Sequence, residues 1–87
     1  MDPVKVLQRA YQDELLDALR AEGAAQGVPY PHVRALLLEV ARRERAHAEA
    51  LAEALRRRGA PLPPTPKPEE GGWETLLRLL SEEGLDR

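Results

Sequence analysis

The 87-residue chain contains no cysteine, which excludes disulfide bonds, thiolate ligands for zinc or iron, and a thiol nucleophile. It also lacks an excess of one charge. The formal net charge is −2, and this gives no electrostatic basis for binding nucleic acid or a membrane surface. No apolar run approaches the roughly 18 residues of a membrane-spanning helix, and no apolar signal segment follows the N-terminus. We therefore expect a cytoplasmic protein.

Phenylalanine, isoleucine and asparagine are absent as well, and aromatic residues make up only 3% of the chain. Leucine and alanine supply most of the apolar side chains, among many glutamates and arginines. These residues form helices readily, whereas the β-branched and aromatic residues that favour strands are scarce. The composition predicts an all-α fold. A chain of this size buries only about two thirds of its unfolded surface, so its own core is thin.

The first predicted helix begins after Asp2, whose side chain can cap it, with Pro3 at the first helical position. It should fade between Gly23 and Gly27. Residues 27–31 contain two prolines and predict a turn, because neither proline can continue a helix.

A second and longer helix is expected from Pro31 or His32 to Arg58, with Gly59 after it in the position that commonly ends a helix. Residues 1–59 then form a helical hairpin. Residues 60–72 are proline-rich and predict a stiff, extended linker, although a ligand for a partner protein is an alternative. Residues 73–87 predict a short amphipathic C-terminal helix.

Each long helix carries ionisable residues within its apolar stripe. On the second helix, apolar spacing of four and three residues runs through Val33, Leu37, Val40, Glu44, His47, Leu51 and Ala54. On the first, it runs through Val4, Leu7, Tyr11, Glu14, Ala18 and Ala21. Burying an unpaired carboxylate costs several kcal/mol, so something must compensate for it. Glu44 and His47 are neighbours on one helix face, and two carboxylates with an imidazole suit iron, manganese or zinc. We predict Glu14, Glu44 and His47 as metal ligands.

Two other interpretations stay open. Glu44 can pair with an arginine while His47 lies at a helix crossing. The three residues then form a buried polar network that fixes the register of a non-catalytic dimerisation or adaptor module. A structural site with one zinc ion is the third interpretation. Tyr11, one turn before Glu14, either donates a hydrogen bond behind the ligands or packs in the core.

Two segments, LQRAYQDELLDAL (7–19) and EVARRERAHAEALAEALRRRG (39–59), resemble the metal-binding helices of the rubrerythrin branch of the ferritin-like superfamily. The resemblance covers roughly residues 3–59. It implies that Glu14 is the first-helix carboxylate, that Glu44 bridges two metals and that His47 is the terminal imidazole. It also implies iron oxidation or peroxide reduction. Since the chain has no cysteine for an electron-transfer iron, a peroxidase would need an external electron donor.

A complete ferritin-like bundle needs a glutamate from each of two helices and a Glu-x-x-His from each of the other two. This chain has one of each, and its other histidine, His32, lies at a helix start. It resembles half a ferritin, similar to proteins that form larger rings, sometimes inside protein shells. We expect the hairpin to form a homodimer, a ferritin-like four-helix bundle with two irons per dimer, or manganese or zinc instead.

The C-terminal segment 76–86 repeats the leucine, arginine, glutamate and aspartate spacing of residues 7–17. As the start of a third ferritin helix it would supply Glu82 or Glu83 as an extra ligand. We favour a short helix that covers an open end of the bundle, because Gly84 ends the helix where a ligand helix would continue.

Overall fold

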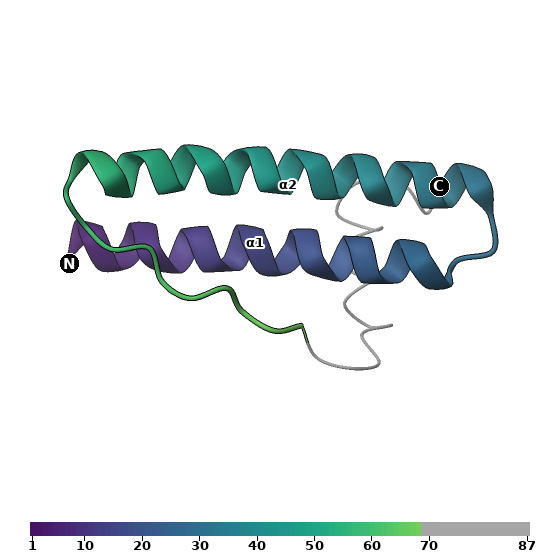
Figure 1. Ribbon diagram of the computed structural model, residues 1–87, viewed down its shortest axis with the longest axis horizontal. Helices are drawn as coiled ribbons and strands as arrows, with labels where there is room; N and C mark the ends of the chain where they lie inside the picture. Colours follow the sequence, from purple (N-terminus) through teal and green to yellow (C-terminus); the bar gives the residue numbers. More distant parts are fainter. Residues whose placement is uncertain (69–87) are drawn as a thin grey trace.

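The computed structural model describes residues 1–68, which form two antiparallel helices, α1 (Pro3–Gly27) and α2 (Pro31–Arg57). The helices lie side by side along their whole length (Figure 1). The predicted all-α hairpin is confirmed for this part of the chain. The predicted C-terminal helix, with Glu82 and Glu83, lies outside the described residues.

The start of α1 follows the prediction. Asp2 is the capping residue, and its Oδ1 accepts a hydrogen bond of 3.0 Å from the backbone N–H of Val4. Pro3 takes the first helical position, where a missing N–H leaves no bond unmade. The helix runs through Gly23 and ends at Gly27, so the glycine at 23 does not break it.

Hydrogen bonds from Arg34, in the first turns of α2, hold the turn between the helices in place. Its Nε donates to the carbonyl of Ala25 at 3.2 Å, and its Nη2 donates to the carbonyl of Val28 at 2.9 Å. Ala25, Val28 and Leu37 form a buried cluster beneath the turn. The guanidinium therefore satisfies carbonyls that the end of α1 leaves without helical partners.

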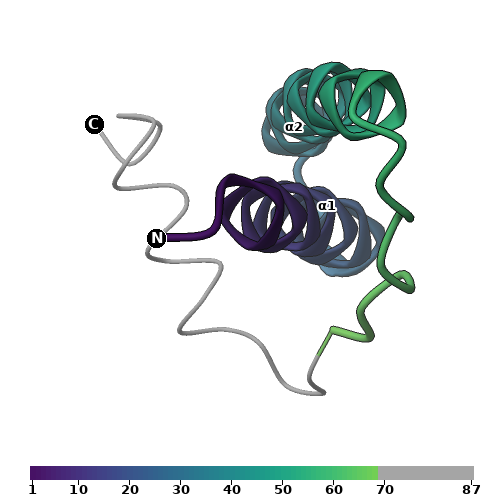
Figure 2. The ribbon, with the colours of Figure 1, turned by 90° about the vertical axis from the view of Figure 1, so that its left-hand side faces the viewer.

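The far end of α2 is closed by Gly59, which has a φ of 67° in the left-handed region that favours glycine. The N–H of Gly59 donates to the carbonyl of Arg56 at 2.9 Å, and the N–H of Ala60 donates to that of Leu55 at 3.0 Å. This pair of bonds is the Schellman motif. It reverses the chain, and residues 61–68 then run along α1 in the same direction as that helix (Figures 1 and 2).

The core between the helices is a narrow row of small and aliphatic side chains. On α1 the buried residues are Leu15, Ala18, Ala21 and Ala25. On α2 they are Leu37, Val40, Ala41, Ala48, Ala52 and Leu55. Alanines at the contact let the helices approach closely, but they bury little apolar area per residue. Neither helix is apolar enough over a sufficient length to cross a membrane.

The second half of the predicted stripe on α2 does not face α1 within one hairpin. His47, Leu51 and Ala54 were expected on a buried bundle face, and the residues buried against α1 are their neighbours Ala48, Ala52 and Leu55. Burial of the predicted stripe against a second copy stays a prediction. The spacing of four and three assumes 3.5 residues per turn, whereas a straight helix has 3.6, and the difference turns the stripe by about 20° per heptad. As a result His47 lies at the edge of the helix pair, with 54% of its side chain exposed.

Candidate metal centre

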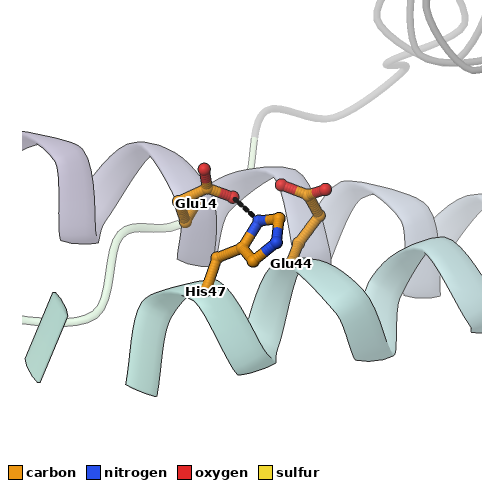
Figure 3. Close-up of side chains that lie close together, drawn as sticks. All are labelled: Glu14, Glu44 and His47. Carbon is orange, nitrogen blue, oxygen red and sulfur yellow. Dashed lines mark ion pairs between the residues drawn. The ribbon is translucent and has the colours of Figure 1, made fainter. Parts of the chain in front are cut away.

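Glu14 on α1 faces Glu44 and His47 on α2, and one ligand atom from each residue lies within 4.8 Å of the other two (Figure 3). Glu44 and His47 are three positions apart, so the α-helix places them on one face, one turn from each other. The antiparallel pairing of the helices then brings Glu14 opposite them. The structure thus brings together the three residues that the sequence predicts as ligands.

Glu14 contributes an oxygen without a partner. Its Oε2 is buried, and it accepts no hydrogen bond from the residues that the structure describes. The Nδ1 of His47 lies 3.5 Å from this oxygen, which is an ion-pair contact if the imidazole is protonated (Figure 3). A buried carboxylate oxygen without a hydrogen bond is costly, and a bound cation would satisfy it.

Glu44 is the most perturbed acid of the cluster. Burial raises its pKa, and the neighbouring carboxylate of Glu14 raises it further, to about 7. His47 and Arg43 act in the opposite direction. The Nε of Arg43 lies 3.7 Å from Oε1 of Glu44. Two acids held this close with little water repel each other, so the cluster is arranged at the expense of stability unless a cation joins it.

The donor set fits a transition metal. Two carboxylates and one imidazole are the ligand types that iron, manganese and zinc accept. Three residues do not complete the coordination of such an ion, which takes at least four ligands. The exposed side of His47 shows where further ligands would enter, since the cluster opens at the edge of the helix pair rather than inside it.

The other predicted site residue, Tyr11, is half-buried on α1 one turn before Glu14, and its role stays a prediction. An arginine partner for Glu44 was one of the open interpretations, and the structure places Arg43, the residue directly before it in the sequence, beside Glu44. Arg45 does form an inter-helix pair, with both its Nε and Nη2 2.7 Å from the carboxylate of Glu22.

A helical hairpin with a glutamate on one helix and Glu-x-x-His on the next has the make-up of half a ferritin-like bundle. The Rubrerythrin family profile matches residues 5–73. The chain therefore belongs to the rubrerythrin family, whose members are ferritin-like proteins that typically bind iron. Comparison with curated proteins and with solved structures gives no match.

Proposed function

We propose that two copies of this chain form a four-helix bundle around a di-iron centre that oxidises iron or reduces peroxide. The observation that carries the proposal is the convergence of Glu14, Glu44 and His47 at one edge of a single hairpin. A second copy placed against this edge would bring an equal set, so the dimer would offer four carboxylates and two imidazoles, twice the set of one chain.

The edge of the hairpin at the cluster is apolar enough to favour a partner. We call the α2 stripe of Leu36, His47 and Leu51 the cluster flank. Leu36 is 38% exposed, and Leu51 is half-buried, so α1 alone does not cover this flank. A two-helix hairpin has no second layer to bury such residues against, and a two-fold contact between identical flanks is the commonest solution.

Bound iron would supply the electron transfer to oxygen or peroxide, which no side chain of this set can provide. The residues have three tasks. Glu14 and Glu44 neutralise cationic charge, and His47 contributes a nitrogen donor at the exposed side. Because its pKa is about 7, the carboxyl of Glu44 is partly protonated near neutral pH and would release a proton as it takes a cation. Without cysteine in the chain, electrons for peroxide reduction would come from an external donor.

A non-catalytic dimerisation or adaptor module is the second candidate. It is favoured by the contacts that the cluster makes on its own, 3.5 Å between His47 and Glu14 and 3.7 Å between Arg43 and Glu44. In that case the polar cluster would fix the register of the helices. Manganese, or one zinc per site, is the alternative to iron within the metal-binding candidate.

Metal analysis of the protein purified from cells grown with added iron tests the proposal. We expect one iron per chain, because each chain supplies half of the ligands for two ions. Manganese or zinc at the same ratio would support a metal centre of another kind. A protein that takes up no metal with iron, manganese or zinc supplied in turn would support the adaptor module.

A further inference from the structure

The segment after α2 is buried with a period of three residues. Ala60, Pro63 and Pro66 are half-buried, whereas the residues between and after them, 61–62, 64–65 and 67–68, are exposed. A polyproline II helix has three residues per turn, so Ala60, Pro63 and Pro66 share one side of it. We call residues 60–68 the strap. Its burial pattern is that of an extended helix with one face docked, not that of a free linker.

Two glutamines of α1 hold the backbone of the strap. Gln8 Nε2 donates to the carbonyl of Pro61 at 3.0 Å, and Gln12 Nε2 donates to the carbonyl of Pro64 at 3.2 Å. The two acceptors are one polyproline turn apart, and the two donors are one α-helical turn apart. The strap therefore offers a backbone carbonyl at every third residue, and α1 offers a glutamine at a spacing of four residues. The long glutamine side chains make up for the difference between these two spacings.

The strap lies on the side of α1 away from the metal cluster. Gln12 and Glu14 are two positions apart, which separates them by about 200° around an α-helix. The row of Gln8 and Gln12 continues along the helix to Leu16 and Leu19, both half-buried. A flank with two leucines is a second surface through which such a small hairpin can associate.

The strap reaches this flank only from its own chain. Pro61 follows Gly59 by two residues, and Gly59 and Ala60 are bonded to the last turn of α2. The connection from α2 to the strap is therefore short, and it places Pro61 within reach of Gln8 of the same chain. Proline also has little conformational freedom to lose, so docking the strap costs less entropy than docking an ordinary segment.

We propose that the strap is an intramolecular polyproline ligand of α1 and that it restricts self-association of the hairpin to the opposite flank, which carries Glu14, Glu44 and His47. The strap occupies the flank beside Gln8 and Gln12, which leaves the cluster flank as the contact for a second copy. An assembly with one two-fold contact then stops at the dimer, whereas two usable flanks permit continued association.

The test separates docking from assembly. Thr65 is exposed and the natural chain has no cysteine, so Thr65→Cys accepts one spin label. The label should broaden amide signals of α1 around Gln12. In the full chain, Gln8→Glu/Gln12→Glu removes both donors and sets carboxylates against the carbonyls, while glutamate keeps the helix propensity of glutamine. Gln26→Glu, at an exposed position of the same helix, is the control.

We expect the double variant to lose the broadening of the α1 amide signals. Its mass by light scattering should rise by about twofold or more, because a second contact between copies would join dimers. Gln26→Glu should change neither. Iron per chain should stay that of the unchanged protein, because the cluster lies elsewhere. A protein that binds no metal, or that is a monomer before the change, would contradict the proposed function while the gain of mass still supports the strap.

Three results would overturn the strap proposal. The first is no broadening of α1 signals in the unchanged chain. The second is a released strap with no change of mass. If the glutamate variant keeps its strap, Pro63→Ser/Pro66→Ser replaces the two half-buried prolines and is judged by the same measurements. The third result is a strap that stays docked in both variants, because it would then be held by neither the glutamines nor the prolines.

Discussion

The imidazole Nδ1 of His47 lies 3.5 Å from Oε2 of Glu14, although the two residues belong to different helices. This contact joins a half-exposed base to a buried oxygen that accepts no hydrogen bond from the described residues. It defines the mouth of the cluster, because the third member, Glu44, lies deeper between the helices.

Replacing His47 with alanine should weaken metal binding by more than roughly tenfold. Loss of a residue that only hydrogen-bonds to a ligand already weakens metal affinity by about tenfold or more, and loss of a ligand should cost more. The loss arises because the cluster has a single nitrogen donor. His32→Ala is the matched control, since His32 is exposed at the start of α2 and outside the cluster. Titration with ferrous iron under anaerobic conditions measures both. Equal affinities for the two variants would remove His47 from the ligand set.

Replacing Glu44 with leucine should stabilise the metal-free protein and abolish its stabilisation by metal. The change removes a carboxylate that is crowded by Glu14 and adds apolar burial of roughly 1.5–3 kcal/mol if it packs well. We therefore expect thermal melts with chelator to shift up, and the rise caused by ferrous iron to vanish.

Glu39→Leu, at an exposed position of the same helix, is the control for that experiment and should stay within about 0.5 kcal/mol of the unchanged protein. A lower melting temperature for metal-free Glu44→Leu would contradict a metal site built at the expense of stability. It would indicate that Glu44 holds an ion pair that the fold requires.

The stability of the metal-free protein should depend on pH through Glu44. Its pKa in the folded chain is raised from 4.5 to about 7, so the folded state binds this proton more tightly than the unfolded state does. The stabilisation is complete below about pH 4.5 and is lost as pH rises through 7. Glu44→Gln should flatten this part of the profile, and Glu39→Gln should not. Chemical denaturation across this range measures it, and identical profiles would contradict the crowded acid.

The chain should not be a monomer at micromolar concentration. Light scattering that returned the mass of one chain, 9.7 kDa, would contradict the shared centre. Leu36 and Leu38 are 38% and 43% exposed. Residues two positions apart on an α-helix lie on nearly opposite sides of it, so the two leucines face different surroundings. Leu36→Glu, on the cluster flank, should break the dimer and weaken metal binding. Leu38→Glu should leave both unchanged.

Removing residues 60–87 should leave metal uptake per chain largely intact, because Glu14, Glu44 and His47 all precede the strap. Metal analysis of the shortened protein checks this. If it still assembled but lost its metal, Glu82 or Glu83 would have to be ligands.

Local signals in the sequence were sufficient for the helices and for the choice of the three candidate ligands that the structure brings together. Asp2 and Pro3 predict the start of α1, and Gly59 predicts the end of α2, because capping depends on a few adjacent residues. The pairing of Glu44 with His47 also follows from sequence, since three positions on a helix are neighbours whatever surrounds them.

What the tertiary structure alone decided is which residues the second helix turns toward the first. The pattern of apolar residues placed His47 on a buried bundle face, and within the hairpin Ala48, Ala52 and Leu55 pack against α1 while His47 lies at the edge of the helix pair. The docking of the strap on α1 also depends on the tertiary structure. Gln8 and Gln12 meet Pro61 and Pro64 only after the hairpin closes, because the partners of a long-range hydrogen bond depend on the path of the chain between them.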